Sequence, residues 1–122
     1  MNKRITEAFA KSKAFIPFIT AGDPCLSKTV EYVVQMAKAG ADIIEIGIPF
    51  SDPTAERSVI QEGNLRALSG GVTTDKVFDM VRRVRQKVTL PMVFMTYANV
   101  VFSYGTARFL DKAAEVGIDG LI

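Results

Sequence analysis

The sequence has no histidine and no tryptophan, and Cys25 is its only cysteine. A single cysteine has no second thiol with which to form a disulfide within the chain. Without histidine, it also has no imidazole to complete a metal site or a nucleophile–base pair. We therefore expect no metal centre, and we interpret Cys25 as a small residue in a loop.

Long hydrophobic runs and a strong charge of either sign are also missing. The longest apolar stretches, residues 14–21 and 43–50, are too short to cross a bilayer. The N-terminus is basic but has neither the apolar segment nor the cleavage site of a signal peptide. The net charge is +2, and the densest basic cluster, residues 82–87, alternates with apolar positions as on a solvated helix face. These features predict a cytoplasmic protein that binds neither membranes nor nucleic acids.

The residues that are present predict a single α/β domain over residues 1–122. Apolar segments without polar alternation are typical of strands buried on both faces, and they occur at 14–20, 42–48, 91–96 and 119–122. Apolar residues at helical spacing predict helices at 5–11, 59–68 and 106–116, and after the N-caps Ser27 and Thr73. This order predicts a parallel sheet covered by helices.

Three strand–helix units and the start of a fourth strand fit two architectures. A doubly wound sheet has this length, but the sequence has no glycine-rich dinucleotide fingerprint. A (β/α)8 barrel of the TIM type usually needs about 250 residues. We favour the first half of such a barrel, truncated after the start of the fourth strand. A repeated pattern, Ala-x-x-Gly-x-Asp at residues 37–42 and 114–119, fits the short helix-to-strand turns of either fold.

Glu45 is the most informative polar residue, because it lies inside the apolar run Ile-Ile-Glu-Ile-Gly-Ile. Active sites of parallel α/β folds lie at the carboxyl ends of the strands. Burial would disfavour the charged carboxylate and raise its pKa, which suits a general acid–base residue. The alternative is a structural glutamate that pairs with a lysine or caps a turn.

Other polar and aromatic side chains follow the same predicted strand ends. Asp52 and Glu56 lie in a loop stiffened by two prolines, although either one considered alone is expected to be a solvated loop charge. A second group could line a pocket for a flat apolar ligand, with Phe18 equally suited to plain barrel core, and consists of Phe18, Thr20, Tyr97 and Asn99.

Several segments, in order and at matching spacing, resemble the tryptophan synthase α subunit family. They are FIPFITAGDP, AGADIIEIGIPFSDP, Ile60-Gln61 with NLRAL, GVT, and MTYANVVFSYG, and the run EIGIPFSDP is the most specific of them. The resemblance covers residues 15–122. It implies a (β/α)8 barrel that cleaves indole-3-glycerol phosphate to indole and glyceraldehyde 3-phosphate in a retro-aldol step of tryptophan biosynthesis.

The resemblance also implies roles for individual residues. Glu45 matches the catalytic glutamate that shuttles protons, and Glu56 matches a second catalytic carboxylate that polarises the indole N–H. Phe18 and Tyr97 match positions that line the indole pocket.

A partner subunit is implied as well. Pro49, Asp52 and Asn99 match positions near the contact with the β subunit in an α2β2 complex. The β subunit carries pyridoxal phosphate, so we expect no cofactor on this chain.

The sequence departs from the family pattern after the second carboxylate. Arg57 and Ser58 replace the usual Gly-Pro, which removes backbone freedom and stiffness. Arg57 is also able to pair with Glu56 and divert it, and Gly63 replaces a more usual alanine. The family's mobile loop and phosphate site belong to later strands, so we expect little activity from these 122 residues alone.

Two other functions are compatible with a half-barrel. A non-catalytic interaction module could assemble through open sheet edges at the first and fourth strands. An aldolase-type barrel is disfavoured, because no lysine lies at a strand end to form a Schiff base.

Overall fold

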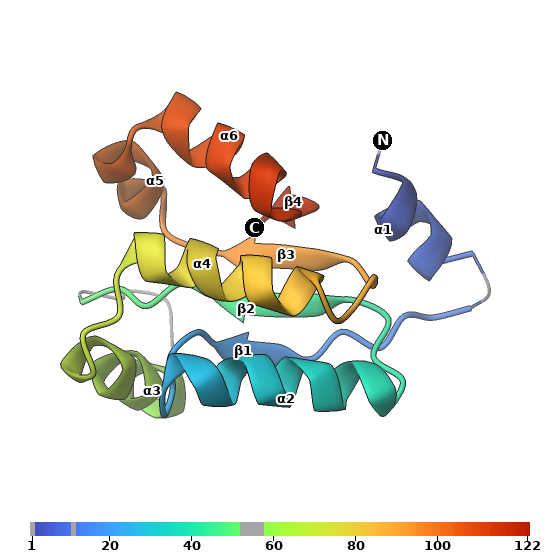
Figure 1. The fold of residues 1–122 in the computed structure, drawn as a ribbon, viewed down its shortest axis with the longest axis horizontal. Coiled ribbons are helices and arrows are strands. Elements are labelled where there is room, and N and C mark those ends of the chain that lie inside the picture. The colour runs from blue at the N-terminus through green and yellow to red at the C-terminus, as the bar shows by residue number, and fades with distance from the viewer. Residues whose placement is uncertain (1, 11, 52–57) are drawn as a thin grey trace.

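The computed structural model describes residues 2–10, 12–51 and 58–122. Helices and strands alternate along the chain, as Figure 1 shows. Their bounds are α1 (Lys3–Ala8), β1 (Phe18–Thr20), α2 (Leu26–Lys38), β2 (Ile44–Gly47), α3 (Ser58–Ser69), α4 (Thr74–Arg85), β3 (Met92–Met95), α5 (Ala98–Tyr104), α6 (Thr106–Val116) and β4 (Gly120–Leu121).

The strands form one parallel four-stranded sheet in the order β1-β2-β3-β4. Glu45 of β2 lies beside Phe18 of β1 on one side and beside Val93 of β3 on the other. Val93 in turn lies beside Gly120 of β4. The predicted α/β fold with a parallel sheet is therefore confirmed.

The hydrophobic core lies between the sheet and the helices α2, α4 and α6, which cover one of its faces (Figure 1). On the sheet side, the fully buried side chains are Ile44, Ile46, Met92 and Phe94. On the helix side they include Val33, Val77, Phe78, Val81 and Phe109. Because side chains alternate across a strand, Glu45 belongs to the opposite face, which is the barrel-facing side of the sheet in the fold expected from the sequence.

Some predicted boundaries were wrong. Helix α2 begins at Leu26 with Cys25 as its N-cap, two residues before the predicted N-cap Ser27, whose hydroxyl lies 3.3 Å from the Cys25 sulfur. Helix α5 was not predicted, because it has only 7 residues and its N-cap, Tyr97, makes no capping side-chain hydrogen bond. The strands are shorter than the apolar runs, since an apolar run reports burial, whereas a strand also needs a paired neighbour.

Other boundaries were predicted correctly. Thr73 caps α4 by accepting a hydrogen bond from Lys76 N–H at 3.2 Å. Helix α6 spans Thr106–Val116 as expected, and Gly117 ends it in the left-handed conformation, at φ +95°.

The repeated Ala-x-x-Gly-x-Asp pattern forms the same turn twice. Its two glycines have positive φ angles of +104° and +95°, and each turn leads directly into a strand. The aspartates then reach the preceding strand region: Asp42 accepts from Phe15 N–H at 2.7 Å, and Asp119 accepts from Met92 N–H at 3.0 Å. The repeat therefore links neighbouring chain segments at the amino ends of the strands.

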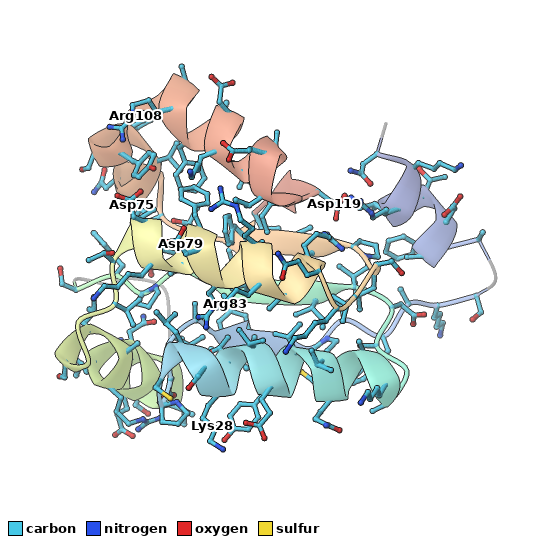
Figure 2. The ribbon with its side chains drawn as sticks, viewed as in Figure 1. Lys28, Asp75, Asp79, Arg83, Arg108 and Asp119 are labelled. Carbon is cyan, nitrogen blue, oxygen red and sulfur yellow. The ribbon has the colours of Figure 1, made fainter. Side chains whose placement is uncertain are left out.

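Asp119 also holds the N-terminal helix in place. Its side chain is 1% exposed and accepts from Arg4 at 2.8 Å, Asn2 at 2.8 Å and Arg85 at 3.0 Å. Arg85 donates as well to the carbonyl of Leu90 at 2.7 Å. Figure 2 shows Asp119 facing α1 from the end of α6. This network ties α1, α4 and β4 together.

None of the helices in the described part of the chain is long and apolar enough to span a membrane.

Candidate active site

Phe18 and Glu45 lie within β1 and β2, and the other described candidate residues lie at or just beyond the carboxyl ends of β1, β2 and β3. In Figure 1 these ends face α3 and α5. The strand ends of parallel α/β folds are where binding groups converge, because each strand there gives way to a loop.

Glu45 is partly exposed, contrary to the expected burial of its carboxylate. The physical reason is its side of the sheet: the apolar helices pack on the face that carries Ile44 and Ile46, and Glu45 points the other way. Within the described residues, its carboxylate makes no hydrogen bond and no ion pair. The structural alternative of a lysine-paired or turn-capping glutamate therefore has no support in the described contacts.

Phe18 lies on the same side of the sheet as Glu45. Its ring covers Gly47, since a Cβ atom built on Gly47 would lie 2.6 Å from Phe18 Cζ and 2.9 Å from Cε2. Phe18 is partly buried and does not belong to the hydrophobic core under the helices. The apolar ring of Phe18 therefore lies on the same side of the sheet as the Glu45 carboxylate, in space left free by the absent side chain of Gly47.

Thr20 is 8% exposed and lies near α3. A Cβ atom built on Gly63 would be 3.6 Å from Thr20 Oγ1 and 3.0 Å from Asp23 Oδ2. Asp23 forms a bidentate ion pair with Arg66, at 2.8 and 3.0 Å, and this charged partner raises the pKa of Arg66. Thr20 therefore lies close to the Asp23–Arg66 ion pair that connects α3 to the loop after β1.

Tyr97 and Asn99 begin helix α5. The Tyr97 ring packs on Phe50, with ring centroids 5.1 Å apart and planes tilted by 33°. Asn99 lies with Pro49 in the lining of a cavity of about 390 Å³. The rest of its described lining comes from the loop after β2, the α3–α4 region and α5, and consists of Ile48, Phe50, Ser51, Leu68, Val72, Thr73, Thr74, Val100, Ser103 and Tyr104.

The structure thus separates the predicted residues into two places. Phe18 and Glu45 share the barrel-facing side of the sheet, whereas Pro49 and Asn99 line the cavity of about 390 Å³, which we call the outer cavity. Phe18, Thr20 and Tyr97 are not in the described lining of that cavity. Asp52, Glu56 and Arg57 fall outside the described residues.

Sequence reasoning missed two polar pairs near these places. One is Asp23 with Arg66, and the other is Asp75, which accepts from the Tyr104 hydroxyl at 2.6 Å and so raises the pKa of that phenol. Asp23 belongs to the FIPFITAGDP segment that carries part of the family resemblance. Its partner is 43 positions away along the chain, and no local pattern identifies such a pair.

The described residues contain no group of three or more histidine, cysteine, aspartate or glutamate side chains that could hold a metal ion.

Comparisons with known proteins agree with one another. Residues 6–122 match the family model described as tryptophan synthase alpha chain. The alpha chain of Lacticaseibacillus casei is 48% identical over 119 residues, which is 98% of this chain and 45% of the relative. That of Alkaliphilus metalliredigens is 51% identical over 110 residues, which is 90% of this chain and 41% of the relative.

Solved structures give the same result. The crystal structure of tryptophan synthase subunit alpha from Legionella pneumophila matches with a TM-score of 0.94 and 43% identity, over 99% of this chain and 48% of that one. A chain of the tryptophan synthase a2b2 complex from Pyrococcus furiosus matches with a TM-score of 0.85 and 39% identity, over 88% of this chain and 43% of that one. This chain spans about half the length of the curated relatives it matches.

Proposed function

Since this chain belongs to the tryptophan synthase alpha chain family, we propose that it supplies the proton-transfer part of a lyase site for indole-3-glycerol phosphate. The reaction is a retro-aldol cleavage to indole and glyceraldehyde 3-phosphate, in the cytoplasm. The observation that carries the proposal is the Glu45 carboxylate, which has no partner among the described residues and lies beside Phe18 on the barrel-facing side of the sheet.

The chemistry of the cleavage requires a group that both accepts and delivers a proton. The broken bond joins indole C3 to a carbon that bears a hydroxyl group. That hydroxyl loses its proton as it becomes the aldehyde, and C3 gains a proton as it becomes part of indole. A carboxylate such as Glu45 can accept in its ionised form and donate in its protonated form. Glu56 is the proposed second carboxylate, polarising the indole N–H.

The indole ring needs an apolar wall beside these carboxylates. Phe18 offers one, because its ring occupies the space beside Gly47, two residues beyond Glu45. Thr20 and Tyr97 are proposed to complete the substrate side, at the ends of β1 and β3. The proposed reaction requires no cofactor on this chain, and pyridoxal phosphate is expected on the β subunit.

The outer cavity is the proposed docking surface for the β subunit. It joins Pro49 with Asn99, and the neighbouring Phe102 on α5 is 67% exposed. A large exposed aromatic next to a concave surface is typical of an anchor in a protein–protein interface. Asp52 is proposed to contribute from the loop after β2.

The proposal can be tested in a complete barrel. Residues 1–122 would be fused to the remainder of the Lacticaseibacillus casei alpha chain, and indole release from indole-3-glycerol phosphate would be measured. We expect Glu45→Gln to lower kcat by about a thousandfold, because the amide cannot exchange protons. Glu62→Gln, an exposed glutamate on α3, is the matched control and should leave kcat unchanged. If the Glu45→Gln chimera has the kcat and the thermal unfolding of the unchanged chimera, the proposal is wrong.

A further inference from the structure

A second cavity lies at the opposite end of the sheet from the candidate active site. Its volume is about 330 Å³, and it is formed where α2 and α4 end and the chain turns toward β2 and β3. Its lining consists of Val34, Ala37, Lys38, Ala41, Lys87, Val88, Thr89 and Leu90. None of these residues takes part in the proposed lyase site, so the two sites are independent.

The floor of this cavity is apolar. Val88 is 8% exposed, and Val34, Ala37, Ala41 and Leu90 pack against the hydrophobic core. A volume of this size is at the lower end of the range for small-molecule sites, which begins at about 300 Å³. The cavity can therefore hold the apolar body of a small ligand.

The polar groups of the lining are of one charge sign. Lys38 comes from α2 and Lys87 from the turn after α4, so each wall supplies one ammonium group. Both side chains are exposed, and neither forms an ion pair or hydrogen bond with another described residue. Thr89 adds an exposed hydroxyl, and the described lining contains no carboxylate.

The acidic residues nearest in the chain already have partners. Asp42, next to Ala41, accepts from Phe15 N–H, and Glu31 on α2 pairs with Lys28 at 3.2 Å. The remaining nearby cation, Arg85, is turned toward Asp119 and backbone carbonyls. Neither of the two cavity lysines forms an ion pair with the described groups around them.

Lysines near helix C-termini often serve the helix itself, by bonding its last carbonyl groups. Here those carbonyls have other donors: Ala39 N–H bonds Gln35 O at 2.9 Å, and Lys87 N–H bonds Val84 O at 2.9 Å. Elsewhere in this chain a lysine does bond a turn carbonyl, since Lys76 Nζ donates to Gly71 O at 3.0 Å. Lys38 and Lys87 make no such bond in the described structure.

We propose that this cavity binds a small amphipathic carboxylate, with its apolar body on the Val34–Leu90 floor and its carboxylate at the rim beside Lys38 and Lys87. The apolar floor excludes a fully hydrated ion such as free phosphate as the preferred ligand. The pair of lysines distinguishes an anionic ligand from a neutral one of the same shape, because compact ammonium groups attract a carboxylate without requiring bidentate geometry.

The test uses 2-naphthoate as the probe and its neutral amide, 2-naphthamide, as the shape-matched control. Both are titrated into the protein at low ionic strength and followed by methyl NMR. We expect 2-naphthoate to shift the methyl signals of Val34, Val88 and Leu90, and to bind about tenfold more tightly than the amide. Equal affinity of the two compounds, or shifts confined to other methyl groups, would overturn the proposal.

Two variants complete the experiment. Lys38→Gln with Lys87→Gln should weaken 2-naphthoate binding about tenfold and leave the amide unaffected. Lys13→Gln with Arg83→Gln removes the same net charge from exposed positions outside the lining and should change neither affinity. Ala37→Leu fills the floor while keeping both lysines, and should abolish binding of both compounds. Retained binding in the Ala37→Leu protein would mean that the ligand sits elsewhere.

Discussion

The environment of a strand residue in this protein depends on the face of the sheet to which its side chain points. Glu45 is flanked along its own strand by Ile44 and Ile46, which are buried under helices, while its own side chain is partly exposed. Because side chains alternate along a strand, Glu45 points away from the apolar core and leaves no gap in it. Phe18 reaches the same side because it is the register partner of Glu45.

Gly47 sets the position of the Phe18 ring. Gly47→Ala would bring a Cβ atom to 2.6 Å from Phe18 Cζ, so the ring must move away from β2. We expect a loss of about 1 kcal/mol in the free energy of unfolding, because the partly exposed ring can shift. In the chimeric barrel, KM for indole-3-glycerol phosphate should rise more than kcat falls.

The control for this change is Gly120→Ala on β4. A Cβ atom there meets Val93 at 3.4 Å, which is nearly ordinary contact. Its unfolding and KM should stay close to those of the unchanged chimera. An unchanged KM in the Gly47→Ala protein would show that the Phe18 ring does not contact the substrate.

At the scale of elements, the two helix-to-strand turns differ in what surrounds their aspartates. Asp42 and Asp119 both bond the backbone of the preceding strand region. Only Asp119 is enclosed by arginines, and its side chain is 1% exposed. The same local sequence pattern therefore makes a simple turn in one place and a junction of three elements in the other.

Asp119→Asn should destabilise the fold by about 3 kcal/mol, because it leaves Arg85 and Arg4 without their counter-charge. Asp42→Asn is the matched control and should have a smaller effect, since only its backbone bond is weakened. Urea unfolding at neutral pH measures both. Equal effects of the two substitutions would contradict the role of the arginines.

The same carboxylate makes stability depend on pH. Burial raises the pKa of Asp119, but the Met92 N–H, Arg4 and Asn2 lower it by more, so the pKa lies below its ordinary value. A lowered folded pKa means that the stabilisation is fully present above the unfolded value of about 3.9. It is lost as pH falls through the folded pKa. The Asp119→Asn protein should therefore lose less stability on acidification below pH of about 4 than the unchanged protein.

Helix α5 is the element that separates the two proposed surfaces. It follows Tyr97 on the substrate side and carries Asn99 and Phe102 on the partner side. Phe102→Ser should weaken binding of a tryptophan synthase β subunit to the chimera by at least about tenfold, measured by calorimetry, because interface aromatics dominate binding energy. Leu110→Ser, a 47% exposed apolar residue of α6 outside the cavity lining, should have no effect. Equal affinities for the two variants would remove α5 from the proposed interface.

At the scale of the whole molecule, the four-stranded sheet is about half of what a closed barrel needs, since such a barrel has eight strands. The proposed substrate has a phosphate group, and the family resemblance assigns its binding to later strands. The proton-transfer groups and the phosphate anchor would thus belong to different halves of a barrel.

We therefore expect the 122-residue chain by itself to release little or no indole from indole-3-glycerol phosphate. Mixing it with a separately produced second half of the Lacticaseibacillus casei alpha chain should restore measurable indole release. Mixing the Glu45→Gln version of the 122-residue chain with the same separate second half serves as the control and should remain inactive. Full activity of the 122-residue chain alone would contradict the division of the site between halves.

The sequence by itself determined the order of elements, the parallel sheet and the family, because helical spacing, apolar runs and the EIGIPFSDP segment are local properties of the chain. It also identified Thr73 as a helix cap and the two glycine turns, since capping depends on a few adjacent residues. Helix α5 could not be predicted from the sequence, because 7 residues are too few to show a helical spacing and no capping side chain marks its start.

Only the tertiary structure decided how exposed Glu45 is, that Asp23 pairs with Arg66, and that Pro49 and Asn99 meet in one cavity while Phe18 lies elsewhere. The physical reason is the same in each case. Burial and pairing depend on which segments pack together across the sheet, and that packing is fixed by the register of distant strands rather than by neighbouring residues in the chain.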